Sequence, residues 1–160
     1  MATTTPLRGT VAALTFSAGA QTLAAGAYAV SSAIDTSILG SGSIAADDVM
    51  LTVSAGIAAT AVANDTIDLY ALTSIDGTTY SDGPADASTD TTHNANMVYL
   101  DSITVPSAAA ATLVSRLLAL AACFRSGEIP RYLKIVVYNG SGAALTSLAA
   151  SVQGINEQVA

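Results

Sequence analysis

The sequence has little charge, and basic residues are its scarcest component. Asp, Glu, Lys and Arg make up 11% of its 160 residues, against about 25% in an ordinary soluble domain. Five basic and twelve acidic residues give a net charge of −7, and Lys134 is the single lysine. Binding to nucleic acid or to anionic lipid needs clustered Lys and Arg side chains. The composition therefore argues against both kinds of partner.

Side chains for catalysis are equally scarce. There is one histidine, His93, and one cysteine, Cys123, so no internal disulfide can form. A Cys–His pair through space stays open, but Cys123 lies in an apolar run, where a thiol usually only packs. The sequence contains no Gly-x-Ser-x-Gly elbow, phosphate-binding glycine loop, CxxC pair or HExxH motif. We predict a protein that is not an enzyme, with no catalytic residue, no cofactor and no small-molecule substrate.

A long polar stretch, residues 76–96, holds the best candidates for metal ligands. Asp82, Asp86 and Asp90 recur in it, with His93 nearby. Loop carboxylates can bind calcium, but this spacing does not match the EF-hand loop, so we predict solvated charges and no metal. A loop of this length is uncommon in a compact domain and is usually functional or interfacial. Six tyrosines and no tryptophan leave a sugar-stacking platform open but unsupported.

Two uncharged segments near the N-terminus imitate membrane or export signals. Residues 9–34 carry no charge, but Thr, Ser, Gly and Gln interrupt them, so they make a poor membrane-spanning helix. Arg8, an apolar run and Ala18-Gly19-Ala20 together resemble a signal peptide. That apolar run is short and contains Thr15. We therefore predict that Thr10–Phe16 is the first β-strand.

Short runs with apolar residues at every second position dominate the sequence, separated by Gly, Asn, Asp and Ser. This pattern is typical of strands in a sandwich or barrel. The predicted strands are Thr10–Phe16, Ala27–Asp35, Asp48–Ala55, Thr66–Ser74, Met97–Val105, Arg131–Asn139 and Leu148–Asn156, with part of Thr112–Arg116 as another. The predicted core contains Ile67, Leu69, Val98, Leu100, Leu133, Ile135 and Val137.

About eight strands predict an all-β fold, a two-sheet antiparallel sandwich of the jelly-roll type. An immunoglobulin-like sandwich is the alternative, but its buried Trp and Cys pair are absent. The Ala-rich segment 106–125 has leucines at helical spacing, so we expect part strand and part short helix there. We expect residues 1–9 to form an extended N-terminal arm and residues 10–160 to form one β-sandwich domain.

The low charge also bears on partners. A densely charged surface keeps a monomer soluble, and this chain has little with which to build one. We therefore expect partners to cover much of the surface, although a monomer coated with Thr and Ser is an alternative. The N-terminal arm has no core of its own and is the predicted partner contact. Its contact residues are Met1, Ala2, Thr3, Thr4, Thr5, Pro6 and Leu7.

Three stretches, in this order, resemble a known group of proteins. They are DLYALTSIDGTTYSDG at Asp68–Gly83, PRYLKIVVYNGSGAAL at Pro130–Leu145 and NEQVA at Asn156–Ala160. Together they resemble small structural proteins of tailed-bacteriophage virions, a group that includes jelly-roll capsid decoration (cement) proteins. The resemblance covers the chain from about residue 65 to its end. The Ala-rich segment 106–125 departs from the pattern.

The resemblance implies a decoration protein that binds the outside of a phage capsid and stabilises it. Its implied partners are the major capsid protein and other copies of itself, as a homotrimer. It would be made in the host cytoplasm and reside on the virion surface. Two alternatives stay open. One is a phage tail, fibre or baseplate module that binds a receptor through loop 76–96, and the other is a secreted carbohydrate-binding β-sandwich.

Overall fold

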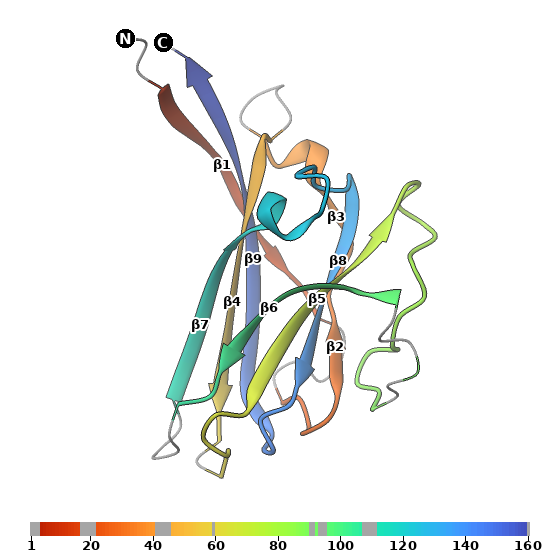
Figure 1. Cartoon of the computed structure of the whole chain (residues 1–160), viewed down its shortest axis with the longest axis vertical. Helices are drawn as coiled ribbons and strands as arrows, with labels where there is room; N and C mark the ends of the chain where they lie inside the picture. Colours follow the sequence, from red (N-terminus) through yellow and green to blue (C-terminus); the bar gives the residue numbers. More distant parts are fainter. Residues whose placement is uncertain are drawn as a thin grey trace.

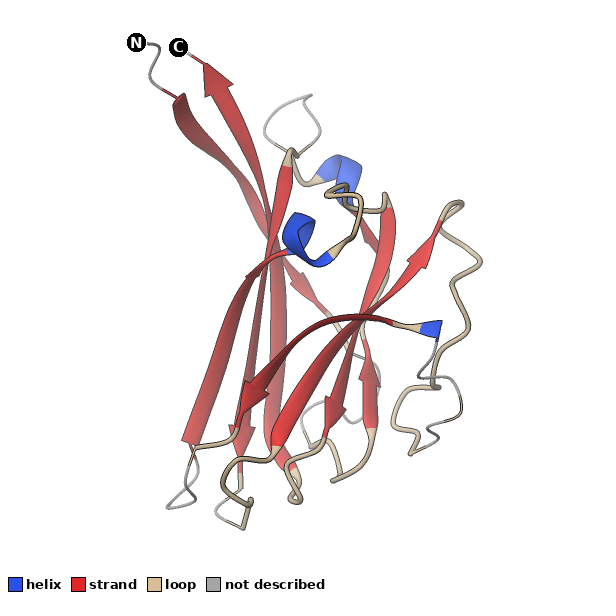
Figure 2. Ribbon diagram, viewed as in Figure 1, coloured by secondary structure: helices blue, strands red, loops and turns tan. Residues whose placement is uncertain are grey.

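The protein consists almost entirely of β-strands, with only short single-turn helices beside them (Figure 2). Its structure is a computed structural model that describes residues 4–16, 22–40, 46–58, 60–89, 92, 96–106 and 112–159. The strands form two antiparallel sheets that pack face to face (Figure 1). The predicted all-β sandwich is confirmed.

Four strands form one sheet, here called sheet A. In spatial order they are β1 (Thr4–Leu14), β9 (Leu145–Val159), β4 (Asp48–Ile57) and β7 (Thr112–Ala119). The other five strands form sheet B. Its path is β2 (Tyr28–Val30), β8 (Tyr132–Asn139), β5 (Thr66–Ser74) and β6 (Val98–Thr104), and β3 (Ile34–Asp35) also pairs with β8.

The order of the strands is that of a jelly roll. Since β2 and β3 both pair with β8, they form one strand of sheet B, interrupted between Val30 and Ile34. The chain then pairs with itself from its two ends inward: β1 with β9, β2 and β3 with β8, β4 with β7, and β5 with β6. Folding such a long antiparallel ribbon into two sheets produces the jelly-roll order, with eight strands when the interrupted one is counted once.

The core lies between the sheets and follows from the alternation in the sequence. In β4, Val49, Leu51 and Val53 are fully buried, whereas Thr52 between them is exposed. Alternating side chains point to opposite faces of a strand, so this pattern puts one face of β4 into the core. Of the predicted core residues, Val98 is partly buried against the core and the other six are buried.

The N-terminal strand is longer than predicted, because β1 begins at Thr4 instead of Thr10. The predicted boundary between arm and domain at residue 9 therefore falls inside a strand that pairs with β9 from Thr4 to Leu14. β9 pairs with β4 only as far as Ile155. The outer ends of β1 and β9 thus continue as a two-stranded ribbon beyond the sheet, with both chain ends at its tip (Figure 1).

The described part of the Ala-rich segment begins with the strand β7 and ends with a short turn. β7 pairs with β4 residue by residue, and the short helix expected after it is the single 3-10 turn η3 (Leu120–Cys123). Leu118 and Leu120 are buried while Leu117 is 62% exposed. The leucines therefore follow the period of a strand, because pairing with β4 outweighs the helical propensity of the Ala- and Leu-rich sequence.

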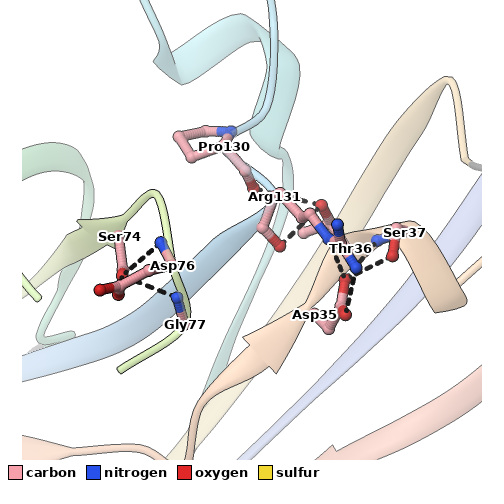
Figure 3. Close-up of polar contacts among 8 residues, drawn as sticks. All are labelled: Asp35, Thr36, Ser37, Ser74, Asp76, Gly77, Pro130 and Arg131. Carbon is pink, nitrogen blue, oxygen red and sulfur yellow. Dashed lines mark hydrogen bonds and ion pairs between the residues drawn. The ribbon is translucent and has the colours of Figure 1, made fainter. Parts of the chain in front are cut away.

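Side-chain hydrogen bonds fix two turns at one end of sheet B (Figure 3). After β3, Asp35 accepts hydrogen bonds from the backbone N–H and hydroxyl of Ser37 at 3.0 and 2.6 Å, and Arg131 pairs with the same carboxylate at 3.4 Å. After β5, the Asp76 carboxylate accepts hydrogen bonds from the Ser74 hydroxyl at 2.9 Å and from the N–H groups of Thr78 and Thr79. Each carboxylate stabilises its turn in place of a backbone hydrogen bond.

Asp76 makes the stability of the protein pH-dependent in acid. Hydrogen bonds from Thr79, Thr78 and Ser74 hold the pKa of Asp76 well below its usual value. A carboxylate with a lowered pKa in the folded state contributes stability above its unfolded pKa of about 3.9, and that contribution disappears as the pH falls further. We expect the melting temperature to fall between about pH 4 and pH 2. The fall should be smaller in Asp76→Asn, and an equal fall in both proteins would contradict the assignment.

Candidate functional site

The central part of the outer face of sheet A, called here the uncharged face, carries no ionisable side chain among the described residues; Arg8 and Asp48 lie at one end of it, each paired with Ile155. Outward positions on its strands are aligned in rows: Val11 lies opposite Gln153, which lies opposite Met50, and the next row contains Ser151, Thr52 and Leu117. The described residues that form it are Val11, Ala13, Met50, Thr52, Ser54, Ser115, Leu117, Ala119, Ala149, Ser151, Gln153 and Ile155. Its side chains are small, hydroxylated or apolar.

Two exposed apolar side chains project from this face. Val11 on β1 is 57% exposed and Leu117 on β7 is 62% exposed. A shallow depression of about 150 Å³ lies between them, with Arg8, Met50 and Gln153 in its lining. Exposed apolar groups are characteristic of surfaces that pack against another protein.

Charged side chains lie along two margins of the uncharged face. Beyond β7, Arg116 forms an ion pair of 2.6 Å with Asp101 on β6, which joins the edges of the two sheets. At the end of β4, the Asp48 carboxylate accepts a hydrogen bond of 3.0 Å from the N–H of Ala121 and so is directed to the turn η3. Asp101 and Asp48 therefore lie at the margins of this face.

Sheet B differs, because its outer face is covered by the chain itself. Tyr28, Leu72, Met97 and Val136 form a second buried cluster there, separate from the core between the sheets. Four partly buried residues surround it: Val30, Tyr70, Tyr80 and Tyr138. The cover is the polar stretch that follows β5.

Backbone contacts hold this cover against the edge of β2. The N–H of Tyr28 donates to Ser88 O at 2.9 Å and the N–H of Ala87 donates to Tyr28 O at 2.7 Å. The N–H of Val30 donates to the Asp86 carboxylate at 2.8 Å. The loop thus occupies hydrogen-bonding positions of an edge strand that would otherwise be open to pairing with another chain. The described part of the long loop therefore shields the edge of sheet B from pairing with another chain.

The structure places the predicted contact residues Thr4, Thr5, Pro6 and Leu7 in β1, in register with Val159 to Asn156 of β9. Met1, Ala2 and Thr3 lie outside the described residues. Asp90 and His93 also lie outside them. Within the described part of the chain, no group of three or more His, Cys, Asp or Glu side chains is arranged to hold a metal ion.

Cys123 lies in a packed environment beside η3. Its sulfur is 3.6 Å from Ala119 O and 3.7 Å from Leu100 O. Burial, with smaller contributions from the charges of Asp101 and Asp48, raises the pKa of the Cys123 thiol. A thiol with a raised pKa is a poor nucleophile at neutral pH.

The chain matches no protein-family model and no curated protein sequence. Among the described residues, no helix is long and apolar enough to cross a membrane.

Proposed function

We propose that the protein is a non-enzymatic structural protein of a bacteriophage virion, a decoration protein that binds the outside of the capsid and stabilises it. Its uncharged face would pack against neighbouring protein, namely the major capsid protein and other copies of the chain. The uncharged face carries this proposal, because within the described part of the chain a loop covers the outer face of sheet B and none covers that of sheet A. The phage setting and the trimer rest on the sequence resemblance alone.

The physical properties of the uncharged face suit such a role. Protein interfaces lose charged residues at their centre and gain apolar ones. Burying Val11 and Leu117, each more than half exposed, removes apolar area from water. Arg8 is the charged residue that lines the depression between them. The acidic side chains elsewhere in a chain of net charge −7 would keep the free protein soluble before it binds. A jelly roll needs no cofactor for this task.

The function is tested on virions of a phage that carries the gene. The protein should be detected by antibody in gradient-purified particles, on the capsid, and particles made without it should break at a lower temperature. This follows because a protein that binds only the assembled state stabilises that state by mass action. Labelling on the tail or fibres would instead support the receptor-binding alternative. Absence from particles, together with a free protein that does not self-associate, would refute the virion assignment.

The N-terminal arm provides a separate prediction. Deleting residues 1–7 removes only the outer part of β1, because β9 remains paired with β4 from Asp48 to Ile57. The far-UV circular dichroism spectrum should be unchanged and the melting temperature should fall by no more than about 5 °C. Co-sedimentation with particles should weaken, since these residues are the predicted contact. Binding as tight as that of the full chain would contradict the arm's role.

A further inference from the structure

Three of the four edges of the described sheets are protected from pairing with another chain. Sheet A ends at β1 and β7, and sheet B ends at β2 and β6. The loop after β5 hydrogen-bonds to Tyr28 and so covers β2. β1 contains Pro6 and a bulge between Arg8 and Val11, and β6 has a bulge at Leu100. Covers, prolines and bulges are the features by which edge strands avoid pairing with another chain.

The edge at β7 has none of these features among the described residues (Figure 1). Its sequence, TLVSRLLA, contains neither Pro nor Gly. It pairs with β4 without a shift in register from Thr112 to Ala119. On an edge strand, every second residue directs its N–H and C=O away from the neighbouring strand. β7 therefore presents a regular row of backbone donors and acceptors with which no described strand pairs.

The middle of β7 is open to solvent on both of its faces. Ser115, Arg116 and Leu117 follow one another and all three are exposed, although successive side chains point to opposite faces. Arg116 lies opposite Val53, which is fully buried, so its side chain starts from the inner face of sheet A. A groove of about 410 Å³ lies there between β6 and β7, with Ile103 in its lining. A further strand beside β7 would cover this opening.

Arg116 is the one charged residue of β7, and its ion pair reduces its effect on pairing. A charge on the inner face of an edge strand normally opposes pairing, because the added strand would bury it. Here the Asp101 carboxylate lies 2.6 Å from the Arg116 guanidinium. A strand added beside β7 would therefore cover a compensated ion pair instead of a lone charge.

From these edges we propose that β7 pairs with β7 of a second copy, antiparallel and about a two-fold axis. A strand turned by such an axis offers a C=O for each N–H, so β7 is complementary to itself. The partner is a second copy because β7 is the open edge that the chain itself supplies. This inference rests on the strand edges and requires no virion.

The pairing would join two four-stranded sheets into one continuous sheet. A two-fold axis perpendicular to the sheet keeps each face on its own side, so the two uncharged faces would lie side by side. Both would remain free to contact other protein. The contact therefore differs from packing of one uncharged face onto another.

Side chains restrict the register of this pair. Outer-face residues such as Ser115 and Leu117 can lie opposite only outer-face residues of the second copy, because a slip of one residue exchanges the faces. A register with Arg116 opposite the same residue of the second copy would oppose two like charges, which is unfavourable. The two adjacent registers instead place either Ser115 or Leu117 opposite its own counterpart.

The test is sedimentation equilibrium of the free, full-length protein without particles. One strand pair is smaller than a standard interface, so we expect a dimer of twice 15.9 kDa with a dissociation constant on the order of 100 µM. Ser115→Lys/Leu117→Lys adds charge to the edge and should weaken the dimer at least about tenfold. Thr52→Lys/Ser151→Lys adds the same charges to the same face on β4 and β9, and should dimerise like the wild type.

Cross-linking tests the register. In a Cys123→Ser background, either Ser115→Cys or Leu117→Cys should form a covalent dimer with a short bis-maleimide, whereas Thr52→Cys should not. A protein that stays monomeric at about 1 mM, or that forms trimers, would overturn the proposal. Equal weakening by the two double-lysine variants would also overturn it, because it would indicate packing through the face. These outcomes leave attachment to particles as a separate question, since no particle is present.

Discussion

Replacing Asn139 by alanine is expected to destabilise the protein by about 3 kcal/mol, which lowers the melting temperature by roughly 10 °C. Asn139 ends β8 and is fully buried. Its side-chain nitrogen is 2.9, 3.0 and 2.8 Å from the carbonyl oxygens of Leu23, Ala24 and Ala143. Its side-chain oxygen accepts from the N–H and hydroxyl of Ser141 at 3.1 and 2.6 Å. Alanine would remove all five hydrogen bonds and leave the buried Ser141 N–H without this acceptor, while the three carbonyl oxygens keep their bonds from Leu145, Ala27 and Ser141.

Two further variants separate the causes of this effect, with urea unfolding as the measurement. Ser141→Ala removes only a hydroxyl, because the Ser141 N–H still reaches Asn139, so it should cost about 1 kcal/mol. Asn139→Asp keeps the size and the acceptor but removes the donor and adds a buried charge. It should be at least as unstable as Asn139→Ala. An Asn139→Asp protein of wild-type stability would show that the donated hydrogen bonds do not hold the fold.

Gly154→Ala is expected to cost about 3 kcal/mol for a different reason, which is steric. Gly154 lies on β9 beside Leu39, which follows η1 (Thr36–Ile38). A Cβ atom there would overlap the carbonyl oxygen of Leu39 and approach Ala46 Cβ to 2.9 Å. Gly9 on β1 contacts the same carbonyl oxygen in the same way. A backbone carbonyl held between two strands cannot move aside as a flexible side chain can.

The control for this prediction is Ser151→Ala, which changes an outward position of the same strand and should alter stability by less than about 0.5 kcal/mol. Both variants are compared by urea unfolding at neutral pH. Gly9→Ala should resemble Gly154→Ala, since both meet Leu39. Stability of Gly154→Ala within about 0.5 kcal/mol of the wild type would show that the segment after η1 is not fixed against the sheet.

Alternation was sufficient to predict the sandwich and most of its core. It works for strands such as β4 and β5, because one face is buried and the other is not. It could not predict the start of β1, since Thr4–Gly9 has no apolar alternation and is a strand only because it pairs with β9. It also missed an interruption, since Ala27–Asp35 was predicted as one continuous strand and the chain forms β2 and β3 there. Between them, the N–H of Ser32 donates to the carbonyl oxygen of Thr15, just after β1, instead of to β8.

The candidate site was only partly accessible from the sequence. On β4, the alternating pattern assigns Met50, Thr52 and Ser54 to the outward side, and all three are uncharged. The sequence alone therefore predicts this strand's part of the uncharged face. The rows across β1, β9 and β7 require the pairing register, which no local pattern contains. The role of Asn139 could not be predicted either, because two of its five side-chain hydrogen bonds reach Leu23 and Ala24, which are distant in the sequence.

The assembly role predicts that added charge on the uncharged face abolishes attachment while the fold survives. The most direct measurement is the fraction of protein that co-sediments with particles lacking their own copy, for wild type and for Thr52→Glu/Leu117→Glu. Ile75→Glu/Thr104→Glu is the matched control, because it adds the same two charges at exposed positions off this face. We predict that binding falls at least about tenfold in the face variant and stays at the wild-type level in the control. Equal binding by the two variants would contradict the account.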